Sequence, residues 1–139
     1  MANRYRKNLR SAIGTSAAPY GYTLATWTTG AVLIHARGVP DTFETLMFMA
    51  GAVAGFAFVG ILAFGSMTGH FAQESRQLPL WESFHFVSVG FSIGSAALVA
   101  HYVGSFIVWS LAPFTSTAVY LLVVGAQLTA ADKIDRKRE

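Results

Sequence analysis

The chain has 139 residues, of which 53% are hydrophobic and only 12% are charged. Soluble domains carry about a quarter charged residues, so this chain has too few charges to cover a water-facing surface. It contains no cysteine, which excludes disulfides, thiolate metal sites and thiol catalysis. The net charge of +3 does not indicate nucleic-acid binding, because Lys and Arg cluster at the termini beside apolar runs. The composition indicates a small membrane protein.

The first predicted membrane span covers residues 13–36 and follows a basic terminus at residues 1–10. This segment is too long and too rich in threonine for the apolar part of a signal peptide, and three more apolar runs follow it. Four of its polar residues fall along one face of the predicted helix: Thr15, Tyr22, Thr26 and Thr29.

The second predicted span, residues 43–69, easily exceeds the roughly 20 residues that a helix needs to cross a bilayer. We expect Asp41 or Thr42 to cap its N-terminus, where Glu44 suits the positive end of the helix. Glycines recur along one face at four-residue spacing and predict close packing against another helix. They are Gly51, Gly55, Gly65 and Gly69.

The third and fourth predicted spans cover residues 83–103 and 107–131, with a turn near Gly104. One face of the third span is polar, and a second face carries the packing glycines. The polar face consists of His85, Ser88, Ser92 and Ser95, and the small face includes Gly90 and Gly94. The fourth span carries Ser116, Tyr120 and Gln127 along one side.

The basic residues predict the orientation of the chain in the membrane. If the termini 1–10 and 132–139 are cytoplasmic, nine Lys and Arg residues lie inside and only Arg37 lies outside. The sequence therefore predicts one domain over residues 1–139, an all-α integral membrane four-helix bundle. Both termini are expected in the cytoplasm, with the multi-pass chain in the plasma or inner membrane.

The polar faces of the first, third and fourth spans allow two interpretations. They could line a hydrated path, with Glu44 and His85 near its opposite mouths, and an intramembrane ionisable group is a functional candidate by default. A histidine on such a path would titrate near neutral pH and could act as a gate. Alternatively, the hydroxyls could bond between helices or to their own backbone carbonyls, which stabilises packing and forms no path.

We predict neither a metal site nor enzymatic activity. The Glu82-x-x-His85 spacing is half of a carboxylate-bundle metal signature, and the spans lack its second half. The sequence has no glycine-rich phosphate loop, nucleophile elbow or pair of catalytic carboxylates. Bis-histidine haem ligation is a further hypothesis, because His70 and His85 share one predicted side of the membrane and His35 and His101 share the other.

Three functions follow from these patterns. The leading hypothesis is a small oligomeric channel or transporter for an ion or small polar solute. The second is a non-transporting membrane subunit or assembly factor that binds a larger membrane partner through its glycine-rich faces. The third is a haem-binding electron carrier. The expected partners are the lipid bilayer and further copies of the chain.

Overall fold

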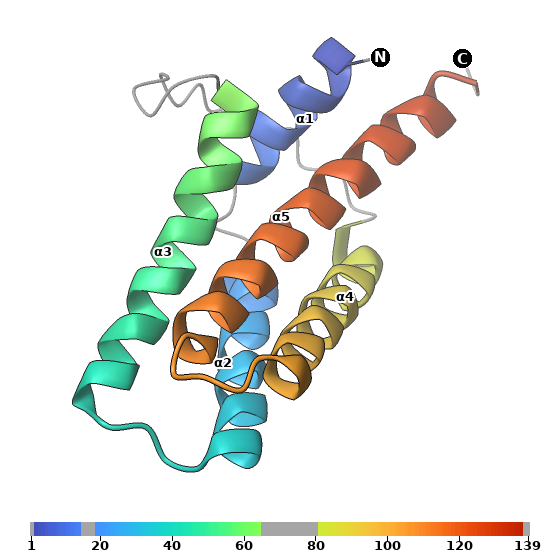
Figure 1. Ribbon diagram of the computed structural model, residues 1–139. Coiled ribbons are helices and arrows are strands. Elements are labelled where there is room, and N and C mark those ends of the chain that lie inside the picture. Colours follow the sequence, from blue (N-terminus) through green and yellow to red (C-terminus); the bar gives the residue numbers. More distant parts are fainter. Residues whose placement is uncertain (1, 15–18, 65–80, 138–139) are drawn as a thin grey trace.

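The computed structural model describes residues 2–14, 19–64 and 81–137, where the regular secondary structure is entirely α-helical (Figure 1). Four long helices occupy the regions of the predicted spans, and a shorter helix precedes them. The five helices are α1 (Ala2–Gly14), α2 (Pro19–Arg37), α3 (Thr42–Phe64), α4 (Trp81–Tyr102) and α5 (Val108–Asp135).

Helix α1 occupies the basic terminus, for which the sequence analysis predicts no packed structure. Tyr5 and Leu9 are four residues apart and so share a helix face that packs against α5. The Tyr5 hydroxyl donates a hydrogen bond to the carbonyl of Leu122 at 3.2 Å, and burial raises the pKa of this phenol. Leu9 is buried over Gly125, where a side chain would collide with it. Within the predicted first span, the structure describes the end of α1 up to Gly14 and α2 from Pro19 onward.

Local sequence signals set the ends of α2 and the start of α3. Proline is favoured at a first helical position, as at Pro19, because its missing N–H has no partner there in any case. Gly38 follows the end of α2 with a φ of 87° and donates its N–H to the carbonyl of Ile34 at 2.8 Å. Asp41 and Glu44 form a reciprocal cap at the start of α3, which confirms Asp41 as its N-cap.

The turn between α4 and α5 lies at residues 103–107 and includes Gly104. The N–H groups of Val108, Trp109 and Ser110 each bond to the carbonyl three residues earlier, so α5 begins with a tight turn. Pro113 lies inside α5 and is buried. The proline cannot donate a hydrogen bond to the preceding turn.

Helix α5 is the centre of the arrangement, since it contacts each of the other four helices. Both termini lie at one end of the structure, and the α2–α3 and α4–α5 connections lie at the other end (Figure 1). Helix α3 approaches α5 closely at Gly51 and Gly55. A Cβ added at Gly51 would lie 2.8 Å from the carbonyl carbon of Ser110 and closer still to its oxygen.

Two apolar clusters fill the interior between the helices. The cluster nearer the termini contains residues from all five helices, and the other lies nearer the connections. The first consists of Leu9, Ala25, Val59, Ala63, Val89, Ala118, Tyr120, Leu121 and Val124, and the second of Leu33, Ala96, Ala100, Val108, Trp109 and Ala112.

Two helices of the described residues are long and apolar enough to cross a membrane. They contain the segments Thr42–Ala63, with a mean hydropathy of 2.2, and Val108–Gln127, with 1.5. The segment of α5 is 61% buried inside the structure, whereas that of α3 is only 28% buried. Helix α3 therefore presents most of its apolar surface outward.

Candidate functional site

Three hydroxyl groups from three helices meet between the two apolar clusters. The Ser116 hydroxyl on α5 lies 2.7 Å from the Thr29 hydroxyl on α2 and 2.6 Å from the Ser92 hydroxyl on α4. Ser92 also donates to the Ser116 carbonyl oxygen at 2.9 Å. We call Thr29, Ser92 and Ser116 the hydroxyl cluster. The structure thus brings together one residue from each predicted polar face.

The hydroxyl cluster is closed to solvent. Thr29 and Ser92 are 0% exposed, and Ser116 is 2% exposed. Among the described residues, no buried side-chain nitrogen or oxygen lacks a hydrogen-bond partner. Buried hydroxyls that satisfy one another tie helices together at little cost, whereas a hydrated path would leave them facing water. In this conformation the cluster connects α2, α4 and α5.

Other residues of the predicted path lie on the same three helices as this cluster. The Tyr22 hydroxyl lies 3.4 Å from that of Thr117, and its ring centroid is 6.0 Å from that of the buried Tyr120. Ser95 donates to the Ser92 carbonyl at 2.7 Å, within its own helix. The remaining members differ in exposure: Ser88 is buried, and Thr26 and Gln127 are half-buried.

Glu44, predicted at a mouth of the path, takes part in the cap of α3. Its carboxylate accepts the N–H of Asp41 at 2.9 Å, and the Asp41 carboxylate accepts the N–H of Glu44 at 2.8 Å. The pair satisfies two helix-terminal donors and places negative charge at the positive helix end. This contact is a structural reason for Glu44 at this position.

Several predicted residues lie outside the described part of the chain. The packing candidates Gly65 and Gly69 and the haem candidate His70 belong to this group. For Thr15, as for the side chains of Glu82 and His85, the structure likewise gives no description. The proposed mouth at His85 stays a prediction.

The predicted packing glycines differ in what they face. Gly51 and Gly55 meet the backbone of α5, and a Cβ at Gly55 would lie 2.6 Å from the Phe114 carbonyl oxygen. Gly90 and Gly94 on α4 are exposed, and a Cβ at either would meet nothing within 4 Å. Of the predicted packing glycines that the structure describes, those of the second span pack within the chain and those of the third span do not.

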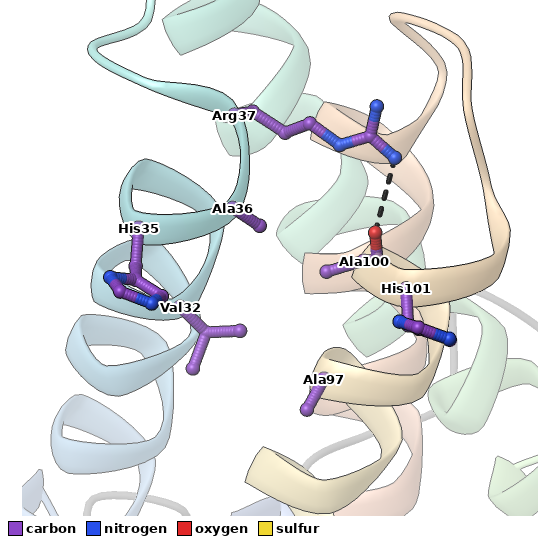
Figure 2. A pocket seen from close by; sticks show the side chains of 7 residues that line it. All are labelled: Val32, His35, Ala36, Arg37, Ala97, Ala100 and His101. Carbon is purple, nitrogen blue, oxygen red and sulfur yellow. Dashed lines mark hydrogen bonds between the residues drawn. The ribbon is translucent and has the colours of Figure 1, made fainter.

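A pocket of about 400 Å³ lies between the last turns of α2 and α4. His35 and His101 stand on opposite walls, with Arg37 above them, and Val32 and Ala97 extend into the space between the helices (Figure 2). Two haem candidates thus share one pocket. Among the side chains that the structure describes, no three His, Cys, Asp or Glu residues are grouped to hold a metal ion.

Arg37 is a tertiary contact that the sequence analysis treats only as a charge outside the membrane. Its guanidinium donates to the carbonyls of Ala100 at 3.1 Å and Gly104 at 3.4 Å, and also to that of Val103. These carbonyls end α4, where a cation is favoured by the helix dipole. The sequence signal for this contact was a basic residue in the last turn of α2. Residue spacing could not show which other helix its side chain would contact.

Comparison of the chain with protein families, with curated proteins and with solved structures finds no match.

Proposed function

We propose that this chain is a multi-pass membrane protein in which α2, α3, α4 and α5 cross the bilayer as a four-helix bundle. The first observation that supports a membrane location is that the apolar segment of α3 is only 28% buried. Large apolar side chains remain exposed along it, including Phe43, Leu46, Met49 and Val53. An apolar face of this size is costly in water and favourable in lipid. At 1.5 Å per residue, the 22-residue segment is about 33 Å long and matches the hydrocarbon core.

The proposed topology has both termini in the cytoplasm. The described basic residues at the terminal end include Arg6, Lys7, Arg136 and Lys137, and all four are exposed. The opposite end carries Arg37, whose charge is engaged by the end of α4. An excess of Lys and Arg on one side favours retention of that side in the cytoplasm.

We propose further that the protein is a non-transporting membrane subunit that assembles with a second copy through α4. The observation that carries this proposal is the contrast between two pairs of predicted packing glycines, one on α3 and one on α4. Packing within the chain explains Gly51 and Gly55, because α5 leaves no room for a side chain at either position. Gly90 and Gly94 have no such neighbour, although an exposed glycine in a helix costs about 1 kcal/mol relative to alanine.

A second copy is the occupant that this surface fits best. Small residues at four-residue spacing allow two membrane helices to approach with their backbones in contact. A twofold dimer uses the same patch on both subunits, so one such face is sufficient for both partners. Packing of α4 against α4 would bury Gly90 and Gly94 at the centre of the interface.

Energy transfer between donor-labelled and acceptor-labelled chains in lipid vesicles tests the assembly. Fluorophores on Lys137→Cys chains report association, since the native chain has no other cysteine. We expect Gly90→Leu and Gly94→Leu each to weaken association at least tenfold, because the larger side chain separates the helices.

Gly60→Leu is the matched control, because Gly60 lies in the membrane segment of α3 and likewise has open space around it. This variant should associate as the parent chain does. Unchanged association of the two α4 variants, with their helical melting curves preserved, would refute the α4 interface. Equal weakening by Gly60→Leu would also contradict it.

Transport is the second candidate function. The meeting of hydroxyls from α2, α4 and α5 in one cluster favours it, because a polar centre within a bundle could bind a small polar solute. Opening such a path would require the hydrogen bonds of Ser116 to break. Because the cluster is closed to solvent in this conformation, it supports a non-transporting subunit more directly than a transporter.

A further inference from the structure

The pocket between α2 and α4 combines an apolar floor with a rim of hydrogen-bond donors. Its floor consists of the small side chains Val32, Ala36, Ala97 and Ala100. Its rim is formed by His35, Arg37 and His101, all of which remain exposed (Figure 2). The volume of about 400 Å³ lies within the range of small-molecule sites.

The rim has unused hydrogen-bonding capacity. Neither His35 nor His101 has a hydrogen-bond partner among the described residues. The ring centroid of His101 lies 5.0 Å from that of the neighbouring Tyr102. Arg37 engages the carbonyls of Ala100, Val103 and Gly104, which uses three of its five N–H groups. Those contacts hold the guanidinium across the top of the pocket.

The charge of the rim indicates the sign of a ligand. No carboxylate is among the residues that line the pocket. The nearest acidic residues in sequence, Asp41 and Glu44, are bonded to each other's backbone in the cap of α3. Arg37 is positive, and each imidazole offers an N–H donor. The rim is therefore suited to an anion, and the floor to an apolar group attached to it.

We propose that this pocket binds a phosphate group carried on an apolar chain. Phosphate presents three or more acceptor oxygens, which suits a rim whose donors come from an arginine and a histidine on α2 and a histidine on α4. The membrane placement proposed above puts the last turns of α2 and α4 at the lipid headgroups, where such a ligand is a phospholipid. A soluble alkyl phosphate has the same chemistry. The inference rests on that placement for the lipid source.

Titration calorimetry with hexyl phosphate tests the site on the full chain in a nonionic detergent. We expect saturable binding, and at least a tenfold loss of affinity in the double variant His35→Gln, His101→Gln. Both histidines are exposed, so this variant should fold. Ala97→Phe should abolish binding because the ring fills the pocket, whereas Ala54→Phe, at an exposed site on α3, should leave binding unchanged.

Competition experiments identify the source of the phosphate. Displacement of hexyl phosphate by dioleoyl phosphatidic acid, and not by inorganic phosphate, supports a lipid headgroup. Displacement by inorganic phosphate alone supports a soluble phosphate. Absence of saturable hexyl phosphate binding, or equal binding by the parent and Ala97→Phe chains, would overturn the proposal. Because binding is read in detergent, its failure is distinct from failure of association or of membrane topology.

Discussion

Ser116 is the residue on which the interpretation of the polar faces depends. Spacing of three and four residues was enough to place the hydroxyls of each helix on one face. Spacing could not show whether that face meets water or the hydroxyls of other helices, because this depends on how three helices are rotated in the bundle. The structure pairs Ser116 with both Thr29 and Ser92, which gives the faces a structural role.

We expect Ser116→Ala to lower the free energy of unfolding by about 1–2 kcal/mol, because Thr29 loses its partner in a buried place. Thr28→Ala is the control. The Thr28 hydroxyl donates to the Leu24 carbonyl of its own helix, and we expect a loss of less than about 0.5 kcal/mol. Thermal unfolding followed by circular dichroism measures both effects.

Solute flux in proteoliposomes separates the two functions for the same variant. The assembly proposal predicts that neither the parent chain nor Ser116→Ala accelerates leakage of small ions. Rapid flux through the parent chain that changes in Ser116→Ala would show that the hydroxyl cluster belongs to a transport path.

At the scale of elements, the four long helices were predictable from their apolar length, and their ends from Gly38, Asp41 and the Gly104 turn. Helix α1 was not predictable, because a basic amphipathic segment packs only when another helix offers a matching face. The glycines of the second span predict close packing of that helix against another one. Helix α3 does meet α5 at Gly51 and Gly55, but the helix that contacts all the others is α5, and α3 turns most of its surface outward.

The close approach of α3 to α5 should be sensitive to a single methyl group. Gly51→Ala places its Cβ against the carbonyl group of Ser110, and backbone cannot move aside as a side chain can. We expect a loss of about 2–3 kcal/mol, the cost of overpacking a tight contact. Gly60→Ala should be neutral or stabilise the chain by up to about 1 kcal/mol through helix propensity.

Chemical denaturation of the two glycine variants, followed by helical signal, measures this difference. Equal stability of Gly51→Ala and Gly60→Ala would contradict the packing of α3 on α5. A larger loss in Gly51→Ala would support it.

At the scale of the whole molecule, the two ends differ in composition. The end with the termini is basic, and the end with the connections carries the pocket of His35 and His101. The pocket was not predictable, although both histidines had been assigned to the same side. Helix length and hydropathy place a residue at a depth in the membrane, but they do not tell which helices are neighbours. The lateral arrangement requires the structure.

The most direct test of the account is the sidedness of four single cysteines introduced into this cysteine-free chain. They replace the exposed residues Asn3 and Lys137 at one end and Val39 and Ser105 at the other. A membrane-impermeant maleimide added to intact cells should label positions 39 and 105, and positions 3 and 137 only after the membrane is opened. Labelling of all four positions from the same side would contradict the proposed topology.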